Sequence, residues 1–176
     1  DDVQIIDNQE FISTVINKLF IEDKDNGIDI YFDCRNEKAL MSSDAGGYKS
    51  VSKLCDKLKW PGELFSAAKS RKWDGTKSVL TQSVDRDDYN GKDILIVDDI
   101  CVYGGTFIGL SKLLRERNCG QLYLAVSHMT IQKQKPELFD AFDHVYTTNS
   151  KYDEYFIPNE HGEPIKPENL TVIKLF

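Results

Sequence analysis

The chain has 176 residues, a length that suits one domain, over residues 1–176, built around a single hydrophobic core. Its 29 acidic and 22 basic side chains give a formal net charge of −7, which argues against nucleic acid or an anionic membrane as the main partner. No apolar run approaches the roughly 20 residues of a membrane span and no secretory leader is recognised, so we expect a cytoplasmic protein.

The four cysteines, Cys34, Cys55, Cys101 and Cys119, are widely spaced and form no CxxC pair. Structural zinc sites usually take paired ligands at short spacing, and disulfides belong mainly to oxidising compartments. We therefore expect four reduced and mostly buried thiols rather than a metal site.

The first part of the chain predicts one helix and two strands. Apolar residues at helical spacing indicate an amphipathic helix from about Asn8 to Phe20. Alternation of apolar and polar residues at 28–32 indicates a half-buried strand, and Ala39 to Met41 a short, more buried one. The second strand leads directly into a loop that contains two glycines.

That loop reads Ser-Asp-Ala-Gly-Gly from Ser43 to Gly47 and precedes a helix with Val51 and Leu54 on its apolar face. Asp44 stands where a helix N-cap is expected, because aspartate accepts hydrogen bonds from the free amides of the first turn. Capping alone would explain Asp44. An acidic residue beside glycines at the end of a strand also suits a ligand site.

A basic segment follows the next predicted strand, Leu64 to Ala68. Lys69 and Arg71 lead into a loop at residues 73–76, and Ser78 to Val84 then alternates as a strand or hairpin arm. A basic cluster of this kind is usually a solvated face. Its place between two glycine loops instead favours a functional role.

The second glycine loop lies within residues 92–117, KDILIVDDICVYGGTFIGLSKLLRER, which predict a strand, a loop and a helix in one run. Ile94 to Val97 form the apolar run of a strand buried on both faces. Asp98 and Asp99 are expected to end that strand at its carboxyl edge, where open parallel sheets place their ligands.

Gly104, Gly105 and Thr106 open the predicted helix of this run. Glycine lets backbone amides approach a ligand closely, and the helix dipole adds positive potential, so these residues predict an anion site. Carboxylates suit the hydroxyl groups of a sugar or a metal ion. A sugar phosphate would satisfy both the acidic pair and the glycines.

The rest of the chain predicts further strands at Leu122 to Val126, His144 to Thr147 and Leu170 to Phe176, with a short helix from Pro136 to Phe142. The segment Tyr152 to Pro167 is expected to be loop-like. Strands alternating with helices indicate the α/β class: a mainly parallel sheet flanked by helices, with ligand loops at one edge.

IVDDICVYGGTF resembles the fingerprint of type I phosphoribosyltransferase-fold proteins, which hold ribose 5-phosphate or PRPP. Ser-Asp-Ala-Gly-Gly resembles the Pro-Asp-Ala-Gly-Gly loop of ribose-phosphate diphosphokinases (PRPP synthetases), in the carboxy-terminal of their two related domains. The Lys-x-Arg of residues 69–71 resembles the pair that opens the catalytic loop of that family. The resemblance covers residues 29–150 and implies the carboxy-terminal half of a two-domain enzyme.

The resemblance implies a role for each matching residue. Asp98 and Asp99 would hold the ribose hydroxyls, and Gly104, Gly105 and Thr106 the 5-phosphate. The cofactor implied is Mg²⁺, near Asp44. The catalytic residues would be the two cations, Lys69 and Arg71, which stabilise the transition state as diphosphate passes from MgATP to ribose 5-phosphate. The implied partners are ATP, ribose 5-phosphate or PRPP, and the missing amino-terminal half or other subunits of a homo-oligomer.

Val102 and Tyr103 stand where the family usually has an aspartate and a threonine. Valine can neither accept a hydrogen bond from ribose nor act as a base. Two alternatives therefore remain open: a stand-alone phosphoribosyltransferase that uses PRPP with a nucleobase or nicotinamide, and a non-catalytic ribose-phosphate-binding or assembly domain. An enzyme is the favoured interpretation, with the isolated chain expected to be close to inactive.

Overall fold

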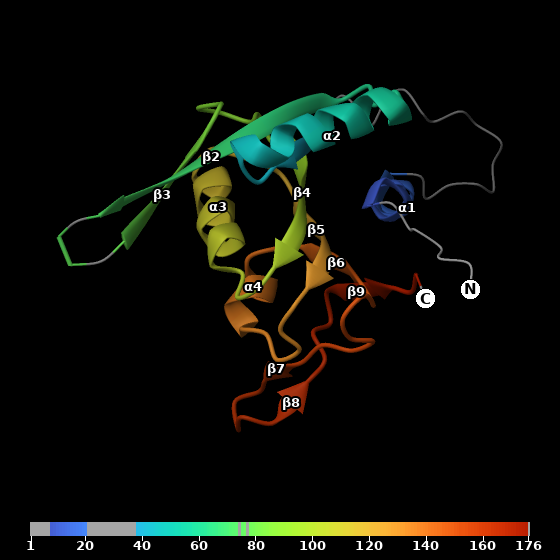
Figure 1. Ribbon diagram of the computed structural model, residues 1–176, viewed down its shortest axis with the longest axis vertical. Coiled ribbons are helices and arrows are strands. Elements are labelled where there is room, and N and C mark those ends of the chain that lie inside the picture. The colour runs from blue at the N-terminus through green and yellow to red at the C-terminus, as the bar shows by residue number, and fades with distance from the viewer. Residues whose placement is uncertain (1–7, 21–37, 74, 77, 176) are drawn as a thin grey trace.

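The computed structural model describes residues 8–20, 38–73, 75–76 and 78–175 (Figure 1). The strand expected at residues 28–32 and the side chain of Cys34 lie outside these ranges. Among the residues described, none of the helices combines the length and the hydropathy that crossing a membrane would require. Cys55, Cys101 and Cys119 are free thiols.

Seven strands form the central sheet, in the order β3-β2-β1-β4-β5-β6-β9. Every neighbouring pair is parallel except β2 and β3, which form an antiparallel hairpin. The mainly parallel α/β fold predicted from the sequence is therefore confirmed. The strands are β1 (Lys38–Ser42), β2 (Glu63–Trp73), β3 (Ser78–Val84), β4 (Asp93–Cys101), β5 (Leu122–Met129), β6 (His144–Thr148) and β9 (Leu170–Ile173).

Helices cover both faces of the sheet. The α1 (Asn8–Phe20) and α2 (Ala45–Leu58) helices pack on one face, and α3 (Gly105–Glu116) and α4 (Pro136–Asp140) on the other. The predicted helix at residues 8–20 is confirmed. The segment expected to be loop-like at residues 152–167 contains a small separate hairpin, β7 (Ile157–Pro158) and β8 (Pro164–Ile165).

The β4 strand lies at the centre of both hydrophobic cores. Its Ile94 and Ile96 side chains pack in the core beneath α3, whereas Leu95 and Val97 pack in the core beneath α1 and α2. All four are at most 5% exposed, because successive side chains of a strand point to opposite faces and helices cover both.

The strand order reverses between β1 and β4. The α2 crossover carries the chain from β1 to β2 on one side, and the α3 crossover carries it from β4 to β5 on the other. In open α/β sheets, ligands bind in the crevice outside the carboxyl ends of the strands at such a reversal. The two glycine loops predicted from the sequence follow β1 and β4, so both lie at this crevice.

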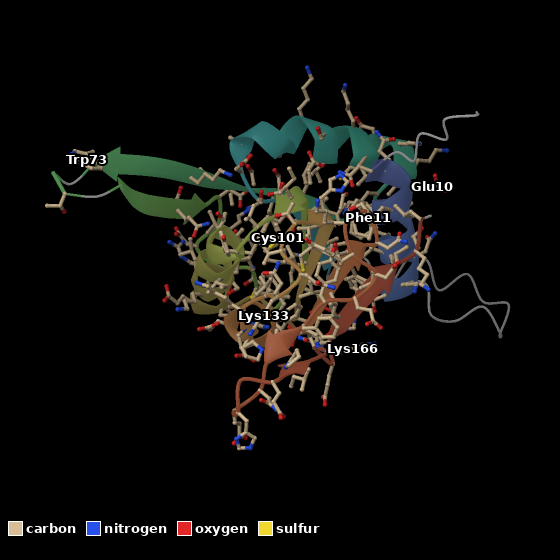
Figure 2. All side chains as sticks on the ribbon, turned by 60° about the horizontal axis from the view of Figure 1, so that its bottom comes forward. Glu10, Phe11, Trp73, Cys101, Lys133 and Lys166 are labelled. Carbon is tan, nitrogen blue, oxygen red and sulfur yellow. The ribbon has the colours of Figure 1, made fainter. Side chains whose placement is uncertain are left out.

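Several strands are longer than the sequence predicted, and the extensions of β2 and β4 lie beside the ligand loops. The β4 strand continues through Asp98 and Asp99 to Cys101, because Cys101 pairs with Met129 of β5 and both side chains are fully buried. The β2 strand continues through the basic segment to Trp73, which pairs with Ser78 of β3. Figure 2 shows the resulting hairpin projecting from the body of the molecule, with Trp73 at its far end.

Candidate ribose-phosphate site

The loop between β4 and α3 is shaped by glycine. Gly104 is the N-cap of α3 with φ 73° and ψ −2°, a left-handed conformation that glycine adopts without steric cost. A Cβ atom at Gly104 would lie 2.8 Å from Leu138 Cδ1. At Gly105, by contrast, a Cβ atom would meet no heavy atom within 4 Å, because this position faces open space.

A cavity of about 400 Å³ opens over this loop. It brings together β2, β4 and the first turn of α3, and it is lined by Lys69, Asp98, Ile100, Val102, Tyr103, Gly104, Gly105, Thr106 and Phe107. The first intrahelical bond of α3 runs from the Ile108 amide to the Gly104 carbonyl, so the preceding amides have no partner within the helix. An anion in the cavity would find those amides and the helix dipole.

The neighbouring thiol of Cys101 belongs to the hydrophobic core beneath α3. Its side chain is fully buried, and burial raises the pKa of the thiol to about 12, although a hydrogen bond from the Gly104 amide acts in the opposite direction. Since that amide is directed at sulfur, the amides of Gly105, Thr106 and Phe107 are the donors that remain for an anion.

Asp98 and Asp99 point to opposite faces of the sheet, because they are successive residues of a strand. Asp98 lines the cavity over the glycines and accepts a hydrogen bond from the Ser43 hydroxyl, which links the two ligand loops. The backbone amide of Asp99 also donates to Asp98 Oδ1, over 2.6 Å. Of the acidic pair, only Asp98 lines the cavity with Lys69.

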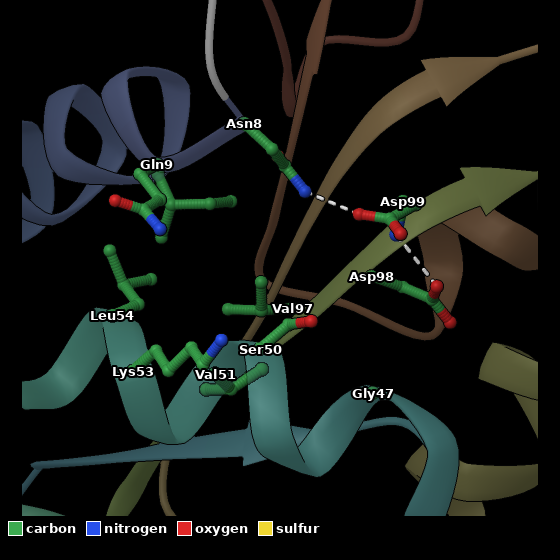
Figure 3. Close-up of a pocket in the computed structure, with 11 residues that line it drawn as sticks. Asn8, Gln9, Gly47, Ser50, Val51, Lys53, Leu54, Val97, Asp98 and Asp99 are labelled. Atoms are coloured by element: carbon green, nitrogen blue, oxygen red, sulfur yellow. Dashed lines mark hydrogen bonds between the residues drawn. The ribbon is translucent and has the colours of Figure 1, made fainter.

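The Asp99 carboxylate instead contacts α1. It accepts a hydrogen bond from the Asn8 side-chain amide, and Asn8 Oδ1 accepts one from the Ser127 hydroxyl of β5 (Figure 3). Sequence reasoning missed Asn8, Ser127 and the role of Ser43. No local pattern reveals the Asn8 contact, because 91 residues separate it from Asp99.

Asp44 and Lys69 form an ion pair at the crevice. Asp44 is also the N-cap of α2, because its Oδ1 accepts a hydrogen bond of 2.9 Å from the Gly47 amide. The hydrogen bond from Lys69 and that from the Gly47 amide hold the pKa of the Asp44 carboxyl below its ordinary value of 3.8. Asp44 therefore stays ionised with Lys69 beside it.

We expect Asp44→Ala to lower the free energy of unfolding by about 1 kcal/mol, because it removes the cap of α2. Asp44→Asn should cost less than about 0.5 kcal/mol, since asparagine also caps helices and the lost ion pair is partly exposed. Because the pKa of the native Asp44 carboxyl is lowered, the stabilisation from its ion pair with Lys69 should be present above pH 3.8. It should be lost as the pH falls through the pKa of the folded state. Urea unfolding of the three proteins between pH 3 and 7 measures both effects. Equal losses for alanine and asparagine would contradict the capping role.

The described residues contain no group of three or more side chains arranged to hold a metal ion. Asp44 already uses one carboxylate oxygen for Gly47 and the other for Lys69. These residues therefore do not fit a preformed magnesium site. The side chain of Arg71 lies outside the described part of the chain. Its backbone lies in β2 opposite Leu80, two residues beyond Lys69.

The comparisons with known proteins agree with this geometry. A family model described as "Phosphoribosyl transferase domain" matches residues 4–155. Two relatives named ribose-phosphate pyrophosphokinase are similar: that of Thermoplasma volcanium is 31% identical over 112 residues, and that of Chlorobaculum tepidum is 27% identical over 146 residues. These matches cover 63% and 82% of the chain, but only 37% and 42% of the relatives.

Solved structures show the same fold. Phosphoribosylpyrophosphate synthetase of Mycobacterium smegmatis superposes with a TM-score of 0.61 at 20% identity, over 95% of this chain and 46% of that one. A purine phosphoribosyltransferase of Pyrococcus horikoshii superposes with a TM-score of 0.51 at 19% identity, over 92% and 93% of the two chains. The resemblance inferred from the two loops is thus confirmed, and the chain belongs to the phosphoribosyl transferase domain family.

Proposed function

We propose that the chain is the catalytic-loop half of a ribose-phosphate diphosphokinase, an enzyme that transfers diphosphate from MgATP to ribose 5-phosphate and forms PRPP and AMP. One observation carries the proposal: a single cavity at the strand reversal is lined by the anion-binding turn of α3, by Asp98 and by Lys69. The similar pyrophosphokinases and the family membership support the same reaction class.

In this proposal the 5-phosphate binds the free amides at the start of α3, and the Thr106 hydroxyl adds a further donor. Asp98 accepts a hydrogen bond from a ribose hydroxyl, and the Ser43 hydroxyl fixes the orientation of its carboxylate. The 1-hydroxyl oxygen of ribose then attacks the β-phosphorus of ATP and loses its proton to solvent. The bond from that phosphorus to the α–β bridging oxygen breaks, and AMP leaves.

Lys69 is the described cation nearest to this transfer in the proposal. It lines the cavity, and its ammonium group is held by Asp44 rather than left free in solvent. In-line transfer at phosphorus depends on positioning and on positive charge more than on a covalent nucleophile. Magnesium would enter with the phosphates of ATP, since Mg²⁺ commonly combines one or two carboxylates with substrate oxygens.

A non-catalytic ribose-phosphate-binding domain is the second candidate, and Val102 favours it. This side chain lines the cavity and is 43% exposed, at a position where an enzyme of this family would carry an aspartate. An apolar side chain there cannot accept a proton or a hydroxyl hydrogen bond. Binding through the α3 amides would survive, whereas turnover would not.

The chain alone should bind ribose 5-phosphate and form PRPP only at a rate close to background. The matches span 37–42% of the length of the similar pyrophosphokinases, so more than half of their length has no counterpart in these 176 residues. Losing a surface that positions one substrate can cost several kcal/mol of barrier, up to about 7–11 for complete loss of positioning.

A coupled assay of AMP release from ATP and ribose 5-phosphate tests this, on the 176-residue chain and on any longer natural protein that contains it. Turnover by the longer protein alone would support the diphosphokinase half. Binding without turnover in both proteins would instead support the non-catalytic domain. Robust turnover by the isolated chain would show that it completes its site by itself.

A further inference from the structure

The segment between β5 and α4 lies against the loop that carries the anion-binding turn. Thr130 follows β5, and its amide donates a hydrogen bond of 2.9 Å to the carbonyl of Cys101, the last residue of β4. Leu138 of α4 lies against Gly104, the N-cap of α3. Between these two contacts, Gln134 reaches the intervening part of the loop.

Gln134 is a buried polar residue, with only 3% of its surface exposed. Its side-chain nitrogen Nε2 donates two hydrogen bonds, one of 3.1 Å to the Val102 carbonyl and one of 2.7 Å to the Ile131 carbonyl. Val102 lies one residue beyond the end of β4, where the pairing with β5 has stopped. The glutamine therefore supplies a partner to a loop carbonyl that the sheet does not reach.

We propose that Gln134 is a positioning residue, which holds the loop between β4 and α3 in the shape that presents its free amides to an anion. The inference rests on the phosphate site of the proposed function and adds to that site a residue that touches neither phosphate nor sugar. Gln134 is not one of the residues that line the ribose-phosphate cavity, and 32 positions separate it from Val102.

The orientation of the Val102 carbonyl matters because carbonyl oxygens repel an anion. A trans peptide unit directs its carbonyl and the following N–H in opposite directions. With the Val102 oxygen held by Gln134, the Tyr103 amide is directed away from Gln134, and the carbonyl cannot turn into the cavity that Val102 and Tyr103 line. A loop that is already ordered also binds its ligand more tightly, since no ordering cost is left for the binding step.

Packing alone does not explain a glutamine at this position. Its Oε1 atom is buried and has no hydrogen-bond partner among the residues that the structure describes. An unpaired buried acceptor lowers stability, and a methionine of similar length would avoid that cost. The amide cannot simply turn over, because Oε1 would then face the carbonyl oxygens of Val102 and Ile131. The donor is thus the part of the side chain that the loop uses.

The backbone that carries Gln134 is itself anchored. The Gln134 amide donates a hydrogen bond of 2.8 Å to the Phe156 carbonyl, and the Phe156 amide donates one of 3.0 Å to the Gln132 carbonyl. Lys133 forms an isolated parallel bridge with Phe156 between them. Because this backbone is fixed, the Nε2 atom can hold Val102 in place rather than follow its movement.

Hydrogen exchange in the ligand-free chain tests the hold on the loop. The amides of Thr130 and Ile108 donate to carbonyls on either side of Val102, so their exchange reports opening of the loop. In Gln134→Met we expect both to exchange about tenfold faster relative to the Ile96 amide in β4. A purely structural role would lower the free energy of unfolding without changing this ratio.

Asn169→Leu is the matched control. Asn169 Nδ2 also donates to two carbonyls, of Phe139 at 3.0 Å and of Phe142 at 2.8 Å, but it lies just before β9 at the amino edge of the sheet. Losing this amide should lower stability and leave the exchange ratio unchanged. Gln134→Asn, whose amide is one methylene shorter, provides a second variant and should change the ratio in the same direction as Gln134→Met.

Calorimetry with inorganic phosphate and with ribose 5-phosphate tests the effect on the anion. Gln134→Met should weaken the binding of both by about tenfold, whereas Asn169→Leu should leave both affinities unchanged. Full affinity for both ligands, or an unchanged exchange ratio, in the folded Gln134 variants would overturn the role of this residue.

The two ligands separate this inference from the proposed function. If the natural chain binds inorganic phosphate but not ribose 5-phosphate, the proposed function fails, and a loss of phosphate affinity in Gln134→Met still supports the positioning role. If the natural chain binds ribose 5-phosphate and Gln134→Met binds it equally well, the positioning role fails and the proposed function stands. Binding of neither ligand by the natural chain would overturn both.

Discussion

Ribose 5-phosphate should lose about a hundredfold in affinity or more when Gly105 is replaced by valine. The position faces the cavity, and a Cβ atom there meets no heavy atom within 4 Å, so the fold should accept the larger side chain. The valine would occupy the space in which a phosphate reaches the free amides of α3. Losing one or two charge-assisted hydrogen bonds, at about 1.5–3 kcal/mol each, accounts for a loss of this size.

Gly104→Ala provides the structural comparison for this experiment. Its left-handed φ of 73° and the 2.8 Å approach to Leu138 should make alanine costly, by about 1–2 kcal/mol of unfolding free energy from the backbone alone. Calorimetry with ribose 5-phosphate and thermal unfolding of both variants distinguish blocked binding from lost structure. Unchanged affinity in Gly105→Val would move the phosphate site elsewhere.

Periodicity alone predicted most of the architecture. The apolar spacing of Phe11, Ile12, Val15 and Ile16 predicted α1, and all four residues are buried in one core. The run from Ile94 to Val97 predicted a strand buried on both faces, which β4 is. These signals are local, because burial of one face imposes a repeat on the residues of the same element.

The ends of strands were less predictable, because pairing with a distant strand decides them. Asp98 and Asp99 were expected to end β4 at its carboxyl edge, where open parallel sheets place their ligands. Pairing of Ile100 with His128 and of Cys101 with Met129 carries β4 two residues further. Likewise, the basic segment of β2 was expected to enter a loop, and its pairing with β3 keeps it extended.

The continued strand also changes how the acidic pair is interpreted. As part of a loop, both carboxylates could have turned toward one sugar. As successive strand residues, Asp98 faces the ribose-phosphate cavity and Asp99 the opposite face. The prediction that both hold ribose hydroxyls stays a prediction, and the geometry favours Asp98 for the sugar beside the glycine loop. Side chains along a strand alternate between its two faces, so Asp98 shares a face with Ile96. The separation of Asp98 from Asp99 could therefore have been inferred from the sequence.

Contacts between distant loops could not have been inferred in this way. Ser43 stands where the similar loop of PRPP synthetases has a proline, and its hydroxyl donates to Asp98, which a proline could not do. The Asn8 amide reaches Asp99 from a helix at the other end of the sequence. Serine and asparagine are common on surfaces and at helix ends, so neither residue type signals a site before the fold brings it to one.

Replacing both Lys69 and Arg71 by alanine in a longer, active form of the protein should slow diphosphate transfer by about 100-fold or more. Lys69 lines the ribose-phosphate cavity, and Arg71 follows it two residues further along β2. Positive charge directed at the phosphoryl oxygens stabilises the transition state more than the ground state, so the rate constant should fall more than substrate affinity.

The same double variant should unfold within about 0.5 kcal/mol of the natural protein, because Lys69 is exposed and substitutions at exposed positions away from the core cost little stability. The Lys69 side chain is 42% exposed, and its ion pair with Asp44 should therefore contribute little stability. Lys49→Ala, at an exposed position on α2, is the control for a lost lysine and should keep the full rate. Steady-state AMP release and urea unfolding measure the two quantities. Normal turnover in the double variant would show that β2 does not carry the catalytic cations.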